Sequence, residues 1–268
     1  MVELVRKCFS QPRLYTYVGP EKPDKLEADL EKRLKRSVPV NKSKTERVKK
    51  FKQLPTEKPR VFLLPYDSAQ FLVGIRTRAG KFSPDPVNMA KIMLFNQYFG
   101  AGGLDNVVFQ EIRESRSLAY SSYAVYSNAM EKDRYDIIFG FVGTQPDKFF
   151  DAADQMLKLF RKMPLHPGKI EQARTKLLKD LSASRTYGNL VGIWFQSEKT
   201  GIKRDLKPEI FQALQKITPQ DIADFAAREL APRPYDIFVA GPVEKLDRAK
   251  LKKYGEIQTV TPKQIFGY

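Results

Sequence analysis

Two side chains that could take part in chemistry, Arg113 and Tyr120, lie seven residues apart where a short helix should give way to a strand. A guanidinium and a phenol both donate hydrogen bonds, so together they could hold a carbonyl oxygen or the oxyanion formed from it. The alternative is structural: Arg113 would complement the C-terminal end of a helix, and Tyr120 would be an ordinary strand aromatic. The residues alone leave both interpretations open.

The remaining reactive residue types are scarce, since the chain has one histidine, His166, and one cysteine, Cys8. A zinc site needs several converging ligands, and a single histidine cannot supply a paired-histidine motif. We interpret His166, between two expected helices, as a loop or helix-capping residue. The serines show no G-x-S-x-G elbow, and one cysteine excludes an internal disulfide. We therefore expect no metal site and no cofactor site in this chain.

A glycine-rich turn at 100–103 follows an expected helix rather than a strand. A phosphate-binding loop should follow a strand and open a helix. We interpret the turn as a helix stop that uses backbone conformations with positive φ.

The chain carries a net charge of +16, and the excess concentrates between Lys32 and Lys58. Such a run can bind phosphates through counterion release. The interpretation we favour is a solvated linker or surface helix. No apolar run is long enough to span a bilayer, and no signal peptide is apparent. The basic residues include Lys42, Lys44, Arg47, Lys49, Lys50 and Lys52.

Three segments are predicted along the chain. Residues 1–37 contain a β-rich run at 14–19 and a helical pattern with leucines at 26, 30 and 34. A lone strand and helix cannot bury their apolar faces, and a similar strand, Gly-Pro and helix pattern recurs after residue 238. We therefore assign 1–37 to the closing strand and helix of a preceding domain. Residues 38–59 read as a basic linker, and 60–268 as one domain.

The domain 60–268 is predicted to be α+β, with a mixed, mostly antiparallel sheet covered by helices on one face. Asp85 should cap a helix that begins at Pro86, and residues 218–221 should form a capping box. The inner stripe of the first helix is predicted at Val87, Ala90, Met93, Leu94 and Tyr98. Strands are expected at about 61–64, 71–76, 119–126, 135–142 and 235–241, and helices at about 86–98, 105–115, 149–160, 167–184, 188–199, 207–215, 219–230 and near the end.

A series of short motifs resembles the C-terminal, zinc-free domain of the bacterial insulinase/pitrilysin family of zinc metallopeptidases. They occur in order at 98–100, 109–114, 118–120, 141–148, 217–222 and 265–268, and cover about 60–268. The resemblance implies a domain of the mitochondrial-processing-peptidase or insulinase type. It further implies that two halves of the enzyme enclose a peptide chamber and that the N-terminal half carries the zinc motif.

In such enzymes the C-terminal half contributes an arginine and a tyrosine that reach the substrate, and Arg113 and Tyr120 occupy those positions here. The resemblance thus implies a substrate-binding and oxyanion-binding role in trans to the zinc. This chain would be part of a metalloendopeptidase and inactive alone, with zinc held by another part of the full-length protein or by a partner subunit. Glu111 and Glu114 are interpreted as helix-surface charges.

The expected partners are the N-terminal zinc-bearing half, or a partner subunit, and a peptide substrate, with no nucleic acid and no membrane span. Location in the periplasm or cell envelope is implied by the resemblance alone. The alternative function is a non-enzymatic scaffold or assembly subunit of the same fold, or a module that binds an anionic partner through the basic linker.

Overall fold

The computed structural model describes residues 2–9, 14–34, 52–129, 131–184 and 189–267. The chain divides into two compact units, one formed by Met1–Lys52 with Thr186–Phe195 and the other by Gln53–Arg185 with Gln196–Tyr268. Helix α6 (Leu190–Thr200) contributes residues to both units. Each unit is described by itself below.

The first unit contains α1 (Val2–Phe9) and α2 (Pro23–Leu34), and α2 confirms the helix predicted there. The strand expected in the β-rich run at 14–19 is not observed, because residues 14–18 form no strand. That prediction is wrong. A short strand is stable only when neighbouring strands complete its hydrogen bonds, and no described strand pairs with these residues. The assignment of 1–37 to a preceding domain stays a prediction.

The predicted linker 38–59 is described only from residue 52 onward, and the basic residues 42–50 lie outside the described residues. The Gln53 side chain exchanges hydrogen bonds of 3.0 and 2.9 Å with the backbone of Tyr135. The Thr56 hydroxyl donates to Asp236 at 2.9 Å. These residues of the linker therefore contact the sheet of the second unit.

The second unit is built on a six-stranded sheet with the order β3-β4-β2-β5-β1-β6. The pairs β3/β4, β4/β2 and β2/β5 are antiparallel, whereas β1 pairs parallel with β5 and with β6. The predicted mixed, mostly antiparallel sheet is confirmed. The strands are β1 (Arg60–Pro65), β2 (Phe71–Lys81), β3 (Ser121–Ser127), β4 (Tyr135–Thr144), β5 (Asp236–Gly241) and β6 (Glu256–Thr259).

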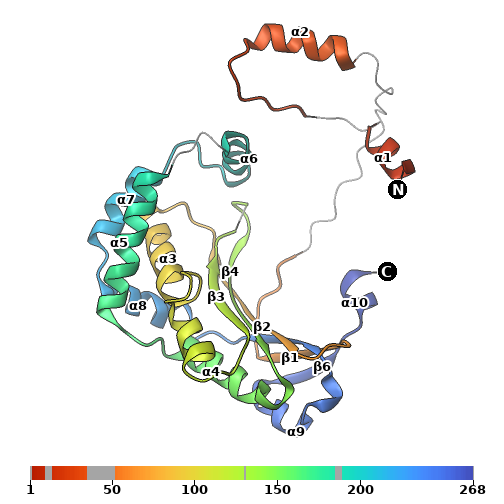
Figure 1. Cartoon of the computed structure of the whole chain (residues 1–268), viewed down its shortest axis with the longest axis vertical. Coiled ribbons are helices and arrows are strands. Elements are labelled where there is room, and N and C mark those ends of the chain that lie inside the picture. The colour runs from red at the N-terminus through yellow and green to blue at the C-terminus, as the bar shows by residue number, and fades with distance from the viewer. Residues whose placement is uncertain (1, 10–13, 35–51, 130, 185–188, 268) are drawn as a thin grey trace. The chain divides into compact units, whose positions relative to one another are not determined.

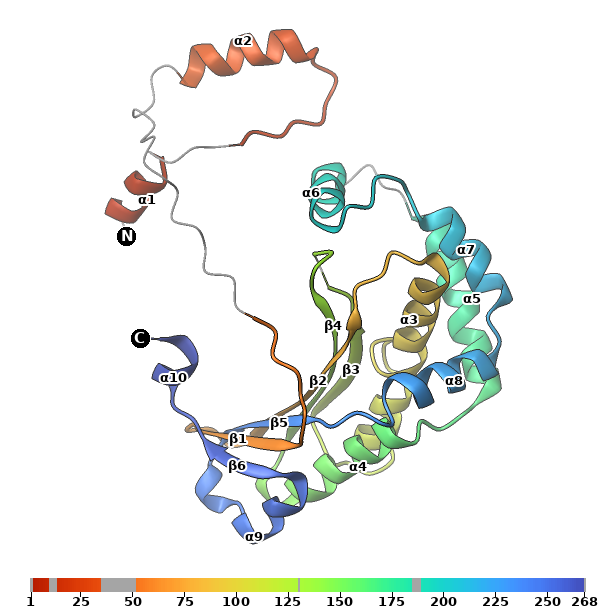
Figure 2. The ribbon, with the colours of Figure 1, turned by 180° about the vertical axis from the view of Figure 1, so that it is seen from behind.

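Helices cover one face of this sheet, and Figures 1 and 2 show α3, α4, α5, α7 and α8 on the same side. Asp85 caps α3 by accepting a hydrogen bond from the Asn88 amide at 2.7 Å, as predicted. The capping box of Thr218 and Asp221 is also confirmed. The helices are α3 (Pro86–Phe99), α4 (Phe149–Arg161), α5 (Pro167–Ala183), α7 (Lys207–Lys216), α8 (Pro219–Glu229), α9 (Arg248–Leu251) and α10 (Pro262–Phe266).

Helix α3 differs from the single apolar stripe predicted for it. Val87 is exposed, whereas Ile92, Phe95 and Phe99, which lie outside the predicted stripe, are buried. The reason is that α3 packs against β3 as well as against α5, α7 and α8, so apolar residues surround most of its circumference. A helix covered on several sides has no one-sided pattern.

The core lies between the helices and the inner face of the sheet. Alternate residues of β1, β2, β4 and β5 are buried there, among them Leu63, Val73, Ile138 and Val239. Full burial of one such side chain stabilises the fold by about 1.5–3 kcal/mol. Gly100 allows the end of α3 to approach β3, because a Cβ there would lie 2.5 Å from the Ala124 carbonyl oxygen. This packing holds the middle of β3 against the end of α3, and the candidate site lies just before β3 begins.

Candidate functional site

The residue pair predicted to act on substrate begins in a short π-helix, η1 (Phe109–Glu114), rather than in the ordinary helix expected at 105–115. The side chain of Asn106 starts it by accepting a hydrogen bond from the Phe109 amide at 2.8 Å. Val108 and Ile112 are fully buried and anchor it to the core. π-Helical turns are rare and occur often at functional sites. Arg113 projects from this turn.

The π-helix ends at Glu114, and three residues later Ser117 has a φ of 50°. The Ser117 amide donates to the Arg113 carbonyl and the Leu118 amide donates to the Ile112 carbonyl, both at 2.9 Å. Among the described residues Ser117 is the only non-glycine residue with positive φ, a conformation that is uncommon outside glycine. This turn redirects the chain from the helix into residues 118–120.

The end of β4 and the turn after it hold the turned segment in place. The Lys148 ammonium donates to the Ser117 carbonyl at 2.9 Å, and the buried Thr144 hydroxyl donates to the Leu118 carbonyl at 2.6 Å. The Tyr120 amide donates to the Gly143 carbonyl at 2.9 Å. The backbone that carries Tyr120 is therefore fixed by three hydrogen bonds from or to β4 and its following turn.

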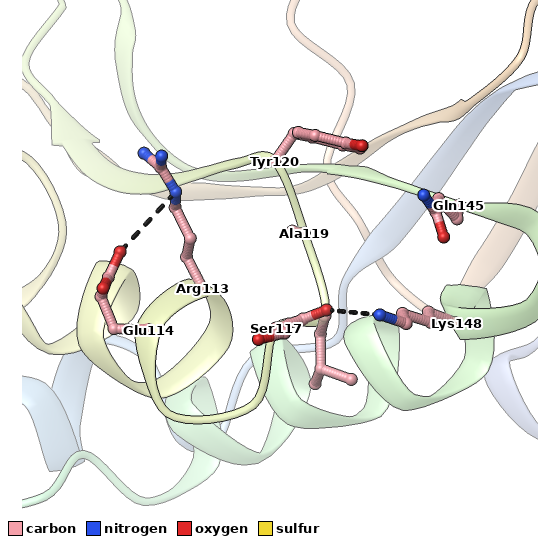
Figure 3. A pocket seen from close by; sticks show the side chains of 8 residues that line it. Arg113, Glu114, Ser117, Ala119, Tyr120, Gln145 and Lys148 are labelled. Atoms are coloured by element: carbon pink, nitrogen blue, oxygen red, sulfur yellow. Dashed lines mark hydrogen bonds and ion pairs between the residues drawn. The ribbon is translucent and has the colours of Figure 1, made fainter.

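Arg113 and Tyr120 line one open cavity of about 410 Å³ (Figure 3). Tyr120 is 62% exposed, and the Arg113 side chain is 46% exposed. Figure 3 shows the Tyr120 phenol directed toward Gln145 and away from the Arg113 guanidinium. The two donors thus share a cavity without touching. Exposed side chains change rotamer within picoseconds to nanoseconds, so the Tyr120 phenol can sample other orientations in the cavity.

The cavity is rich in hydrogen-bond donors and positive charge. The Arg113 guanidinium lies 4.9 Å from the centre of the Phe109 ring, and its Nε lies 3.7 Å from a Glu114 carboxylate oxygen. An exposed ion pair at that distance is weak, so the guanidinium keeps N–H donors for a ligand. Lys148 adds a second cation. The arrangement suits an oxygen that carries partial or full negative charge.

The two glutamates of the π-helix have different surroundings. Glu114 is exposed, which agrees with its interpretation as a surface charge. Glu111 is half-buried and accepts a hydrogen bond from the Gln155 amide at 3.3 Å. Glu111 therefore connects the π-helix to α4, a role that the sequence does not indicate.

No group of three or more His, Cys, Asp or Glu residues is placed to hold a metal ion in the described part of the chain. His166 precedes α5, and its backbone amide donates to the Tyr98 hydroxyl at 3.1 Å. Cys8 is exposed in α1. Among the described residues no helix is both long and apolar enough to cross a membrane.

Comparison with known proteins decides the family. Residues 2–177 match the family model described as the peptidase M16 inactive domain. The chain belongs to this family. The match begins at residue 2, ahead of the region 60–268 that carries the motifs, and ends within α5. No curated protein sequence matches the chain.

Solved structures of the peptidase M16 type share the fold. A peptidase M16 inactive domain from Pseudomonas fluorescens matches with a TM-score of 0.57 and 18% identity over 69% of this chain and 44% of that one. The periplasmic protease PqqL from Escherichia coli matches with 0.57 and 16% over 90% and 29%. Pitrilysin matches with 0.54 and 15% over 89% and 24%. The chain thus spans less than half the length of each of these three structures, and the likeness to pitrilysin agrees with the predicted family.

Sequence reasoning selected Arg113 and Tyr120 but missed the residues that position them. Thr144 and Lys148 lie within the motif at 141–148, yet nothing in that motif indicates that they bind the carbonyls of residues 117 and 118. Such contacts depend on how a later strand end meets an earlier turn. Gln145, which lines the cavity, was missed for the same reason.

Proposed function

We propose that this M16 inactive domain holds the peptide substrate of a zinc metalloendopeptidase. In this proposal Arg113 and Tyr120 bind the carbonyl of the bond to be cut. The zinc belongs to the N-terminal half of the same protein or to a partner subunit. The observation that carries the proposal is that both donors, predicted from sequence, line one exposed cavity.

The residues of this chain suit the binding of a developing oxyanion. As a peptide carbonyl becomes tetrahedral, negative charge accumulates on its oxygen, and preorganised donors stabilise that charge more strongly than the ground state. The Arg113 guanidinium supplies charge and several N–H donors, and the Tyr120 hydroxyl supplies one donor. Lys148 and Thr144 fix the backbone that carries Tyr120.

The described residues of this chain do not fit a zinc site, because no cluster of ligands is present among them. The metal of the other half would act as a Lewis acid and activate a water molecule. In the proposed reaction, this chain holds and orients the peptide. We accordingly expect the chain to be inactive without the zinc-bearing half.

The proposal is tested in an enzyme that contains both halves. Arg113→Ala should lower kcat/KM by roughly 10²–10³, as expected for the loss of one oxyanion donor. Zinc content, measured by atomic absorption, should stay that of the parent enzyme, because Arg113 holds no metal. A loss of zinc together with activity would point to a structural role instead.

The matched control is Arg116→Ala, which removes another exposed arginine of the same segment that does not line this cavity. It should keep kcat/KM within about threefold of the parent, since most surface substitutions change free energies by less than about 0.5 kcal/mol. Parental kcat/KM in Arg113→Ala would refute the proposed role, and an equal loss in both variants would show that Arg113 has no specific part in it.

A further inference from the structure

The open face of the sheet, opposite the helices in Figure 2, is a second candidate binding surface. The strand register aligns one row of outward-facing residues across five strands. Tyr123 of β3 pairs with Phe141 of β4, which pairs with Gly74 of β2. Gly74 pairs with Phe238 of β5, which pairs with Phe62 of β1. We call Tyr123, Phe141, Gly74, Phe238 and Phe62 the aromatic row.

The rings of the aromatic row form two stacked pairs, one on each side of Gly74. Phe62 and Phe238 stack with centroids 4.9 Å apart and an interplanar angle of 11°, and Tyr123 and Phe141 stack at 5.4 Å and 27°. Tyr123 is 42% and Phe238 is 40% exposed. Gly74 has no side chain, and a Cβ added there would lie 3.1 Å from the Phe139 ring. The Phe139 ring therefore lies over Gly74, and its centroid is 6.0 Å from that of Tyr123, so the aromatic surface continues from β3 to β2.

Exposed aromatic residues that are contiguous across a sheet indicate a binding surface, whereas singly scattered ones do not. Leu72, on the same face of β2 and two residues from Gly74, extends the apolar surface and is 42% exposed. A flat, partly exposed aromatic surface suits a large apolar side chain carried by an extended chain.

The charges beside the aromatic row determine which ligand fits. Asp236 is neutralised by Arg60, whose Nε and second guanidinium nitrogen donate to its two oxygens at 2.9 and 3.0 Å. Arg78 lies 4.0 Å from the centre of the Tyr135 ring. Arg76 lies between Phe139 and Asp236 in the strand register, and the structure gives it no hydrogen bond or ion pair with any described residue. The surface thus offers a guanidinium to an anion.

The aromatic row lies close to the candidate site along β3. Tyr123 is three residues beyond Tyr120, which corresponds to about 10 Å at about 3.3 Å per residue of strand. A peptide held at the cavity and running onto the open face would therefore place its third or fourth residue at the aromatic row.

We propose that the open face is a second peptide subsite, selective for extended peptides that combine a large apolar side chain with a nearby carboxylate. The apolar side chain packs on the exposed Phe238 ring, and the carboxylate pairs with Arg76. The inference rests on the proposed function for the peptide nature of the ligand, and it adds the substrate class: acidic, aromatic or branched-aliphatic peptide segments.

The test uses the intact chain and two fluorescein-labelled peptides of about 12 residues, long enough at about 3.3 Å per residue to span the sheet. One contains phenylalanine and leucine flanked by glutamates, and the other has lysines in place of the glutamates. Fluorescence anisotropy should show tighter binding of the acidic peptide, with a preference that decreases as salt is added.

Two variants locate the binding. Arg76→Glu should weaken the acidic peptide about tenfold and favour the lysine peptide, since reversal of one partner replaces attraction by repulsion. Phe238→Ser should weaken both peptides by about five- to tenfold through loss of apolar contact. The matched control is Arg161→Glu, the same charge change at an exposed residue in the last turn of α4. It should leave the preference of the parent chain unchanged.

Equal weakening of acidic-peptide binding by Arg76→Glu and Arg161→Glu would overturn the inference, because it would reflect net charge alone. Self-association of the chain that is abolished by Phe238→Ser would also overturn it, in favour of a second copy as the occupant. Parental turnover in Arg113→Ala, with peptide binding still lost in Arg76→Glu, would refute the proposed function and leave the peptide subsite standing.

Discussion

The two faces of the sheet follow the same alternation of strand residues, but they differ in what they contact. The inner face is aliphatic and aromatic, lies under the helices and is excluded from water, with Val73 and Ile75 fully buried. The open face carries partly exposed rings and arginines, such as Tyr123 and Arg76, on the side of the sheet away from α3, α4, α5, α7 and α8 (Figure 2). The contrast teaches that residues of similar hydrophobicity stabilise the fold on one face and are available to a ligand on the other.

The largest difference between the faces should appear in stability. Phe71, on the inner face of β2, is fully buried and packs edge-to-face on Phe149 with centroids 5.2 Å apart. Phe71→Ala should lower the free energy of unfolding by about 3–5 kcal/mol. Phe238→Ala, on the open face, should cost less than about 1.5 kcal/mol, since part of its ring already contacts water. Urea unfolding followed by circular dichroism measures both, and equal costs would contradict the division of roles.

The inner face also reaches the candidate site, through Thr144. Thr144→Val keeps the shape but removes the hydroxyl that donates to the Leu118 carbonyl at 2.6 Å. Leaving a buried acceptor without its donor should cost about 1–3 kcal/mol. In an enzyme with both halves it should also lower kcat/KM, because the backbone before Tyr120 loses a support.

The matched variant for this second prediction is Thr77→Val, at a threonine that is similarly buried on β2 but pairs with Ile138 of β4, away from the strand end that holds the turned segment. It should keep the parental kcat/KM. If both variants lose activity alike, Thr144 acts through general stability and has no positioning role.

The smallest effect is expected in the helical layer, at the capping box of α8. Thr218→Ala should cost about 1 kcal/mol of stability and leave acidic-peptide binding unchanged. The hydrogen bond from Thr218 lowers the pKa of Asp221. A carboxyl group with a lowered pKa in the fold contributes stability above its unfolded pKa, and that stability is lost as the pH falls through the folded pKa. The variant should therefore show a weaker loss of stability on acidification below about pH 4.

Much of the second unit could be predicted from the sequence, because its elements carry local signals. The Asp85 cap and the capping box at Thr218 mark helix starts whose hydrogen bonds the structure contains. Strand β6 (Glu256–Thr259) was not predicted. It is four residues long and mostly exposed, so its sequence lacks the alternation of buried and exposed residues that would indicate a strand. The burial of Phe95 and Phe99 depends on neighbours that contact α3 from several sides, which no periodicity encodes.

The candidate site was predictable only in part, for a related reason. Arg113 and Tyr120 were selected by residue type and by resemblance, and both line one cavity. The π-helical turn and the left-handed Ser117 were not predicted, since serine gives no signal for positive φ. Arg76 becomes a candidate ligand-binding residue only once the strand register is known. The register places it beside the aromatic row, and it forms no ion pair with a described residue.

The most direct test of the central claim is the turnover of Tyr120→Phe in an enzyme that contains the zinc-bearing half. The substitution removes one hydroxyl from a ring that is 62% exposed, so folding and zinc content should not change. The account predicts that kcat/KM falls by roughly 10²–10³, while Tyr66→Phe, at an exposed tyrosine in the turn between β1 and β2, keeps the parental value. Parental kcat/KM in Tyr120→Phe would contradict the claim that this domain holds the substrate oxygen during peptide cleavage.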